Sequence, residues 1–391
     1  MISIITPSHN TKYLQELEST ILSQTFQDWE WIILLNNGAK YTANDNRIIV
    51  IDFPFNISSV GFLKKYACSF AQGEIIVEVD HDDLLTTDCL EEISKAFESK
   101  EIGFVYSDNA KLGQFTPYDA SYGWVQESFN YNGQSLPVMT GQPLTPGRMG
   151  YIWYAPDHVR AWRKDVYDSI GGHNEVLTVC DDLDLMHRLY LVTKFHYIPK
   201  VLYIYRITGD NTWLQKNKLI QDETVRIYNK DIYNLSCRFA DINGLKKIDL
   251  CGGFNKPAGF LSIDKFNGDI IHNLETGIPL QDNSVGIIRA NDALEHIKNS
   301  QFLMSEIHRV LAPGGMLLSQ TPSTDGRGAW QDPTHVSFWN QNSFWYYTRD
   351  EQAQYIRNDK MFRECKLTTE FLNDYGRINN IPYVIAHLEK L

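Results

Sequence analysis

The sequence has no long hydrophobic run, no excess of basic residues and no paired cysteines, and each absence excludes a class of protein. No apolar stretch approaches the roughly 18 residues of a membrane-spanning helix, and the first residues lack the charged start of a signal peptide. A net charge of -12 argues against a nucleic-acid-binding surface. The six cysteines are scattered without a Cys-x-x-Cys pair, which predicts neither zinc ligands nor disulfides and fits reduced thiols in a cytoplasmic protein.

The remaining signals are those of a globular chain that is long enough for two domains. Its 391 residues are 43% hydrophobic, which is enough for well-formed cores. In the first half, apolar strand patterns alternate with helical spacing, and this alternation predicts a parallel α/β sheet with ligands at the C-terminal ends of its strands. Strands are expected at residues 2–6, 29–35, 47–51, 74–79 and 201–206, and helices at 13–24, 59–71 and 183–191.

The strongest chemical signal is the strand at 74–79, which ends in the carboxylates Asp80, Asp82 and Asp83. Acids this close repel one another unless a positive charge lies among them. A divalent cation bound to a phosphorylated ligand would supply that charge, because Mg²⁺ and Mn²⁺ take one or two protein carboxylates and complete their coordination with phosphates and water. The alternative is structural: Asp83 or Thr87 would cap the following helix. The residues alone leave both readings open.

Several short motifs recur in order along roughly the first 210 residues. They are Ser3-Ile4-Ile5-Thr6-Pro7, Ser23-Gln24-Thr25-Phe26, the strand from Trp31 to Gly38, Ala71-Gln72-Gly73-Glu74, Asp80-His81-Asp82-Asp83 and Tyr205-Arg206. Together they resemble the inverting family 2 glycosyltransferases, which have the Rossmann-like GT-A fold of nucleotide-diphospho-sugar transferases. The resemblance implies a nucleoside diphosphate sugar donor of the UDP, GDP or dTDP type, a glycan or lipid-linked sugar acceptor, and Mn²⁺ or Mg²⁺ as cofactor.

The resemblance also implies roles for individual side chains at the donor. They are Thr6, Pro7 and Asn37 at the base, Asp80 at the ribose and diphosphate, Lys64 and Arg206 near the phosphates, and Asp82 with Asp80 on the metal. Two departures from the family matter. Asn36-Asn37 replaces a pair of acids, so the base would meet an amide that both donates and accepts. Lys64 replaces an arginine, which keeps the charge but loses the bidentate fork; its alternative is a solvated helix face.

Asp182 is the predicted catalytic base. It lies in Cys180-Asp181-Asp182-Leu183, where the resembled family has a Glu-Asp pair at a helix start. Inversion at an anomeric carbon needs a base that removes the acceptor hydroxyl proton while the diphosphate leaves from the opposite face. The alternative, in which Asp181 and Asp182 cap the helix, is compatible with catalysis because a helix N-terminus also favours an ionised carboxylate.

Residues 109–154 mix Gly, Pro, Asn and aromatic residues without periodicity. A long irregular segment in a compact domain is typically functional, and we expect an insertion on the acceptor side that acts as a lid. Its aromatic side chains would pack on sugar rings or, equally well, under the loop itself; they are Tyr118, Tyr122, Trp124, Tyr131 and Trp153. Residues 213–240 then have helical spacing without Pro or Gly, which predicts a bridge between domains.

A second strand-to-glycine turn, at residues 247–253, begins the second domain. Glycines after a strand let a ligand approach the backbone, and the acid that ends the next strand, Asp264, would bind ribose hydroxyls. Downstream, Leu294-Glu295-His296-Ile297 and Arg309-Val310-Leu311-Ala312-Pro313-Gly314-Gly315 resemble class I S-adenosylmethionine-dependent methyltransferases. The segment between Gly253 and Asp264 is too short for the full helix that usually follows the glycine turn. Closing antiparallel strands are expected at 362–370 and 383–388.

This second resemblance implies an S-adenosylmethionine site and residues near the transferred methyl group. The cofactor would be bound by Cys251, Gly252, Gly253, Asp264, Asn273 and Asn291. An Asp that often contacts adenine in the family aligns with Asn273, whose amide can still accept a hydrogen bond. His335, in Asp332-Pro333-Thr334-His335, and His296 are the methyl-transfer candidates, with His335 as a base for sugar O-methylation or as a structural histidine.

The sequence thus predicts an α/β protein with a GT-A domain at 1–212, a helical linker at 213–243 and a methyltransferase-like Rossmann domain at 244–391. The expected function is metal-dependent inverting sugar transfer in surface polysaccharide biosynthesis, in the cytoplasm, with O-methylation of a sugar by the second domain. In the alternative, the second domain is a non-catalytic module that binds the acceptor or a partner.

Overall fold

The computed structural model describes residues 1–55, 57, 59–114, 127–151 and 156–391. The chain divides into two compact units, one of residues 1–144 with 152–229 and one of residues 145–151 with 230–391. The division falls within the long helix α8 (Asn217–Ile242). Each unit has its own sheet and its own hydrophobic core. Among the described residues, no helix is both long and apolar enough to cross a membrane.

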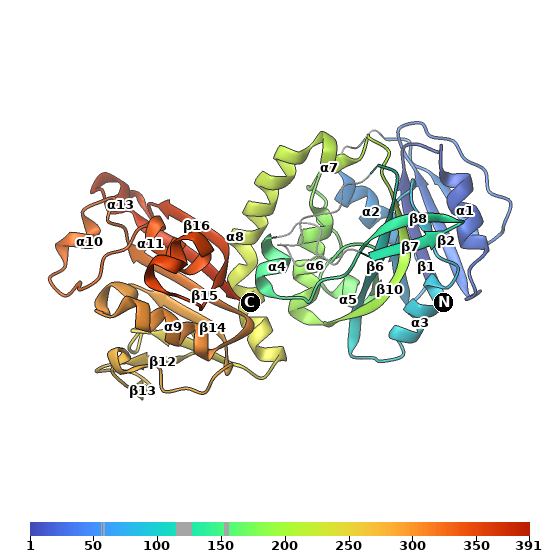
Figure 1. Ribbon diagram of the computed structural model, residues 1–391. Helices are drawn as coiled ribbons and strands as arrows, with labels where there is room; N and C mark the ends of the chain where they lie inside the picture. The colour runs from blue at the N-terminus through green and yellow to red at the C-terminus, as the bar shows by residue number, and fades with distance from the viewer. Residues whose placement is uncertain (56, 58, 115–126, 152–155) are drawn as a thin grey trace. The chain divides into compact units, whose positions relative to one another are not determined.

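The sheet of the first unit has the order β3-β2-β1-β4-β9-β6-β10-β5. Its strands β1, β2, β6 and β10 are labelled in Figure 1. Parallel pairing joins β3 (Ile48–Asp52), β2 (Trp29–Leu35), β1 (Ile2–Ser8) and β4 (Ile75–Glu78). β9 (Arg160–Arg163) runs antiparallel between β4 and β6 (Ile102–Leu112), and β10 (Lys194–Arg206) is parallel to β6 and antiparallel to β5 (Leu84–Leu85). The predicted strands and helices of this half are confirmed, although β10 begins earlier than expected.

Helices cover both faces of this sheet, which is why its central strands are apolar on both sides. In β2, Trp31 and Ile33 face α1 (Leu14–Leu22) and α3 (Cys89–Ala96), whereas Ile32 and Leu34 face the opposite core. That second core is formed with α2 (Val60–Cys68), α5 (Lys164–Ser169) and α6 (Asp181–Val192). Alternate residues of one strand therefore anchor two helical layers.

The prediction of an irregular loop over 109–154 is wrong, because much of the described part of this segment forms strands and a short helix. β6 continues to Leu112, and β7 (Glu127–Tyr131) and β8 (Gln134–Met139) form a hairpin that pairs with β6. Its turn is Asn132-Gly133, with φ of 50° and 82°, and such a pair is the strongest short hairpin signal. Tyr131 lies in this hairpin, whereas Tyr118, Tyr122, Trp124 and Trp153 lie outside the described residues. A short helix, α4 (Pro146–Tyr151), follows within the second unit.

The predicted helix at 213–240 is interrupted at Lys216, between α7 (Thr212–Gln215) and α8. Lys216 is the C-terminal cap of α7, and its backbone N–H bonds to the Thr212 carbonyl. The long amphipathic part of the prediction, α8, is confirmed.

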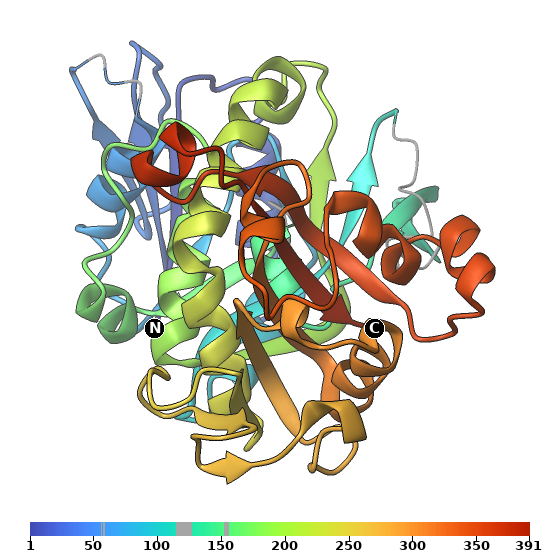
Figure 2. The same ribbon diagram turned by 90° about the vertical axis from the view of Figure 1, so that its left-hand side faces the viewer.

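The sheet of the second unit has the order β13-β12-β11-β14-β15-β17-β16. β13 (Ile270–Ile271), β12 (Leu261–Asp264), β11 (Lys246–Leu250), β14 (Val285–Asn291) and β15 (Leu311–Pro322) are parallel. The predicted closing strands are confirmed: β17 (Tyr383–Lys390), dark red in Figure 2, is antiparallel to both β15 and β16 (Phe362–Glu370). The strand order reverses between β11 and β14, which is where ligands bind in doubly wound folds.

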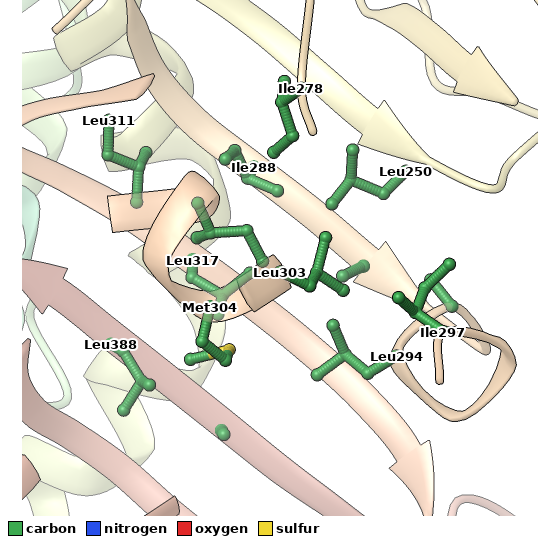
Figure 3. Packing of buried hydrophobic residues seen from close by; sticks show 14 of the residues in the cluster. Leu250, Ile278, Ile288, Leu294, Ile297, Leu303, Met304, Leu311, Leu317 and Leu388 are labelled. Atoms are coloured by element: carbon green, nitrogen blue, oxygen red, sulfur yellow. The ribbon is translucent and has the colours of Figure 1, made fainter. Parts of the chain in front are cut away.

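Helix α9 (Ser300–Val310) supplies much of the second core. Its Leu303 and Met304 pack with Ile288 of β14, Leu317 of β15 and Leu388 of β17 (Figure 3). No helix lies between β11 and β12, as the short spacing predicted, because residues 251–260 form only turns. The remaining short helices are η2 (Leu274–Thr276), η3 (Leu294–His296), α10 (Gly328–Gln331), α11 (Gln341–Thr348), α12 (Asp350–Ala353), η4 (Gln354–Ile356) and α13 (Asp374–Ile378).

Candidate active site

A cavity of about 580 Å³ lies at the carboxyl ends of β1 and β4 in the first unit. The chain leaves these neighbouring strands in opposite lateral directions, so the loops after them diverge and leave a hollow between them. Six of the predicted site residues line the cavity: Pro7, Asn37, Lys64, Asp80, Asp82 and Asp182. Thr6 and Arg206 are not among its lining residues.

Asp80 and Asp82 present carboxylates that form no ion pair with a lysine or arginine among the residues that the structure describes. Asp80 is 40% exposed and its Oδ2 lies 3.7 Å from His158 Nε2. Burial and the neighbouring Asp80 raise the pKa of Asp82 to about 6. Such a shift means that ionised Asp82 is poorly compensated. Two oxygen-donor acids in this state fit a hard divalent cation, which would supply the missing charge.

Asp83 has a different, structural role. It is buried, and its carboxylate accepts hydrogen bonds from the Tyr203 hydroxyl (2.8 Å) and the Arg206 backbone N–H (2.6 Å). The helix-cap alternative for Asp83 and Thr87 is wrong, because β5 follows Asp83 and the N-cap residue of α3 is Asp88.

Beneath the cavity lies a buried charge network that the sequence did not reveal. Lys64 Nζ lies 3.0 Å from both Glu78 Oε1 and Asp181 Oδ2. Burial alone would raise the pKa of Glu78, but Lys64, His173 and Arg160 hold it well below its usual range. Lys64 is 7% exposed, so the alternative of a solvated helix face is wrong. Its predicted contact with the donor phosphates stays a prediction.

Asp182 lies in the first turn of α6 and faces the cavity. Its Oδ2 accepts a 2.6 Å hydrogen bond from Arg160 Nη1, and its Oδ1 accepts one from the Leu183 backbone N–H. Burial alone would raise the pKa of Asp182, but Arg160 and Lys64 bring it below its ordinary value. Cys180 is the N-cap of α6, so the capping alternative for the two acids is wrong, although both remain in the first turn.

The other donor-site predictions stay predictions, and the structure places them as follows. Asn37 has a left-handed backbone with φ 54° in the turn after β2. Thr6 is buried, and its Oγ1 accepts a hydrogen bond from Trp31 Nε1. Arg206 donates to the Asp82 carbonyl and forms an ion pair with Glu16.

Several polar side chains that sequence reasoning passed over also line the cavity. Lys12 and His9 follow β1, and Lys111 comes from β6. Lys216 comes from the junction of α7 and α8. The position of Lys12 and His9 directly after the first strand was a usable signal, whereas Lys111 and Lys216 come from distant elements.

In the second unit, the predicted cofactor residues gather at one sheet edge. Cys251, Asp264 and Asn291 end or follow the adjacent strands β11, β12 and β14. A Cβ at Gly252 would lie 2.0 Å from Asp249 Oδ2, so any other residue here would have to displace the Asp249 carboxylate. Gly253 has a positive φ of 54°.

Two of these cofactor side chains also have local hydrogen bonds. Asp264 Oδ1 accepts from the backbone N–H groups of Phe266 and Asn267. Asn273 caps η2. A tight glycine turn beside an acid at a strand end fits a nucleoside cofactor, and the roles of the individual residues stay predictions.

Comparison with known proteins finds a family in each half. The model of glycosyl transferase family 2 matches residues 3–153, and a methyltransferase domain model matches residues 255–319. The chain is 25% identical over 283 residues to the hyaluronan synthase of Pasteurella multocida, covering 66% of this chain and 26% of the synthase. It is 28% identical over 225 residues to the glycosyltransferase GlyG of Streptococcus pneumoniae, covering 53% of this chain and 70% of GlyG.

The chain spans about a quarter of the length of the hyaluronan synthase. Among solved structures, S. aureus TarS 1–349 in complex with UDP-GlcNAc matches with a TM-score of 0.43 and 15% identity, over 60% of this chain and 72% of TarS 1–349. The two family-model matches, and not this structural likeness, indicate a glycosyl transferase family 2 domain at residues 3–153 and a methyltransferase domain at residues 255–319. Both resemblances in the sequence are confirmed.

Proposed function

We propose that the first domain transfers a sugar, with inversion, from a nucleoside diphosphate sugar to a glycan or lipid-linked acceptor. One observation carries the proposal: Asp80, Asp82 and Asp182 line a single cavity at the strand switch of a family 2 glycosyltransferase domain. Asp82, together with Asp80, would hold Mn²⁺ or Mg²⁺. Such a cation, when bound, neutralises charge on the departing diphosphate.

Asp182 would act as the general base at the acceptor hydroxyl. Its Oδ2 is oriented by Arg160 Nη1 at 2.6 Å, and Arg160 keeps the carboxylate ionised. An ionised and oriented carboxylate can take the hydroxyl proton as the glycosidic bond forms. Arg160 is itself buried and anchored by the carbonyl of Pro156, so the base is held on a rigid support.

We further propose that the second domain binds S-adenosylmethionine and methylates a sugar hydroxyl. The glycine turn after β11 and the acid at the end of β12 support a nucleoside site. The competing proposal is a non-catalytic module that binds acceptor or partner. Both activities would operate in the cytoplasm, in polysaccharide biosynthesis, which agrees with six unpaired cysteines.

Calorimetric titration with UDP, GDP and dTDP, in Mn²⁺ and in EDTA, tests the first proposal. We expect one nucleotide to bind only with metal, and binding to be lost in Asp82→Ala. Asp52→Ala is the matched control, because Asp52 is an exposed acid paired with Lys40 in the same domain. Metal-independent binding, or equal binding by the Asp82 variant, would refute the role of Asp82.

Titration with S-adenosylhomocysteine tests the second proposal. Binding that is lost in Asp264→Ala and kept in Asp359→Ala, where the acid is 82% exposed, would support a cofactor site. Absence of binding by the wild-type chain would favour the non-catalytic module.

A further inference from the structure

Three side chains of the second unit converge at a place that neither proposed activity requires to bind metal. Glu295 and His296 lie in η3, directly after β14, and His335 comes from the loop between α10 and α11. One ligand atom from each lies within 4.8 Å of the other two. The centroids of the two imidazole rings are 5.1 Å apart, and the angle between the ring planes is 72°.

The hydrogen bonds of the histidines leave one ring nitrogen of each available as a ligand. His335 Nδ1 lies 2.9 Å from the Ala329 carbonyl oxygen, which can only accept, so Nδ1 carries the proton and Nε2 keeps its lone pair. His296 Nδ1 lies 3.3 Å from the Thr334 carbonyl oxygen, which favours the same tautomer. A histidine whose far nitrogen donates to a carbonyl is the usual arrangement of a metal ligand.

Glu295 provides the second, independent observation. Its side chain is 2% exposed, and Oε2 accepts a hydrogen bond from Thr321 Oγ1. Within the described residues, the other oxygen, Oε1, is buried without a hydrogen-bond partner. A buried carboxylate oxygen without a donor is costly, and a cation at this position would compensate it.

The backbone fixes the two segments against each other. The N–H groups of Val336 and Ser337 both donate to the Glu295 carbonyl, at 2.9 and 3.0 Å. Ser337 Oγ donates to the Leu294 carbonyl at 2.9 Å. The loop that carries His335 is therefore fastened directly to the turn that carries the other two ligands, and His296 is partly exposed, which gives an ion a path from solvent.

We propose that Glu295, His296 and His335 form a binding site for a divalent transition metal. Two imidazoles and one carboxylate suit Zn²⁺, Co²⁺, Ni²⁺ or Fe²⁺, whereas Mg²⁺ prefers oxygen ligands alone. Two tetrahedral ligands of one ion with bonds of about 2.1 Å lie about 3.4 Å apart, so ligand atoms up to 4.8 Å apart would have to close by up to about 1.4 Å when the ion binds. Three protein ligands leave positions open for water or a hydroxyl group.

The open position gives the site a use if the second domain is a methyltransferase. A hydroxyl bound to such an ion loses its proton more readily, which is what transfer of a methyl group to oxygen needs. This use rests on the proposed function, whereas binding of the metal does not.

Titration of the chelator-treated full chain with Zn²⁺ and with Co²⁺, without nucleotide or S-adenosylmethionine, tests the site. We expect one equivalent to bind, with the visible absorption of Co²⁺ in a nitrogen-ligated site, and His296→Ala and His335→Ala each to weaken binding at least about 10-fold. His272→Ala, which removes another partly exposed imidazole of this unit, should bind as the wild type does.

His296→Ala is the decisive variant, because a partly exposed side chain can be truncated with little effect on the fold. Circular dichroism checks that this variant is folded. Failure of the wild-type chain to bind would overturn the site, as would unchanged binding by folded His296→Ala. If Asp82→Ala instead loses the bound metal ion, the ion belongs to the first domain, and the proposed site in the second unit is overturned as well. S-adenosylhomocysteine binding is measured separately, so failure of the methyltransferase proposal is distinguishable.

Discussion

Replacing Lys64 with methionine tests whether the buried charge network holds the first domain together. Met has a similar length and packs well in apolar surroundings, so the main change is loss of the ammonium group. That group lies 3.0 Å from carboxylate oxygens of both Glu78 and Asp181, which are 1% and 5% exposed. In the variant, two buried carboxylates lose their shared cation.

Removal of one partner from a buried ion pair typically costs about 3–5 kcal/mol. The neighbouring Lys65 is the matched control, because it pairs with Glu175 at 2.6 Å while both side chains are about 40–50% exposed. Exposed pairs contribute only about 0–1 kcal/mol. We therefore expect Lys64→Met to destabilise the domain by several kcal/mol and Lys65→Met to leave it nearly unchanged.

The cost should also depend on pH, because the pKa of Glu78 is held low by Lys64. In the wild type this contribution is present above the unfolded pKa of about 4.3 and is lost as pH falls toward the folded value. The variant loses it, so the two stabilities should differ more at pH 7 than at pH 3.

Urea unfolding followed by hydrogen exchange of peptides from β4 and α2 measures the stability of this unit without interference from the other. A loss below about 1 kcal/mol for Lys64→Met, or equal losses for the two lysine variants, would refute the reasoning. Adding Glu78→Gln and Asp181→Asn to Lys64→Met should restore part of the loss, because neutral groups need no buried cation.

Three further predictions address catalysis, pH and packing. Asp182→Asn should lower sugar transfer by about 10²–10⁴ while nucleotide affinity stays within about twofold; an unchanged transfer rate would exclude Asp182 as the base. Burial and Lys366 lower the pKa of His387 to about 3, so unfolding takes up a proton below pH of about 6.5. Below pH of about 6.5, the free energy of unfolding of the wild type should fall by about 1.4 kcal/mol per pH unit because of His387, as measured by hydrogen exchange of peptides from β15 and β17. The free energy of unfolding of His387→Gln should lack this slope. Above pH 7.5, the two free energies of unfolding should depend on pH in the same way. Leu303→Ala, in the second core, should cost about 2–5 kcal/mol in the same assay, and a loss under about 1 kcal/mol would contradict the packing around α9.

Elements with a strong periodicity could be predicted from the sequence. The prediction is wrong where a short local turn signal decides the structure. β2 was placed residue for residue, because an apolar run from Trp29 to Leu35 serves two cores at once. The prediction of a loop from the nearby Pro and Gly residues is wrong at the hairpin β7–β8, whose turn is Asn132-Gly133. The break at Lys216 carries no Pro or Gly, and pattern alone could not have placed it.

Less of the candidate site than of the fold could be predicted, because the sequence shows which residues are charged but not which of them form ion pairs. Glu78 ends the same strand that leads into Asp80, and nothing in that stretch distinguishes their roles. Lys64 lies 14 residues before Glu78, and Arg160 lies 22 residues before Asp182; the fold alone pairs them.

Five acids at and beneath the cavity fall into two groups, according to whether a lysine or arginine of the protein lies beside them. Glu78, Asp181 and Asp182 have buried cations of the protein within 3.9 Å, from Lys64 and Arg160. Among the described residues, Asp80 and Asp82 form no ion pair with a lysine or arginine, and both line the cavity. A cation supplied from outside would gain little at carboxylates that are already neutralised and much at those that are not. The charge balance of the fold, together with the motif, therefore supports the proposal that Asp80 and Asp82 bind the metal and that Asp182 acts as the base.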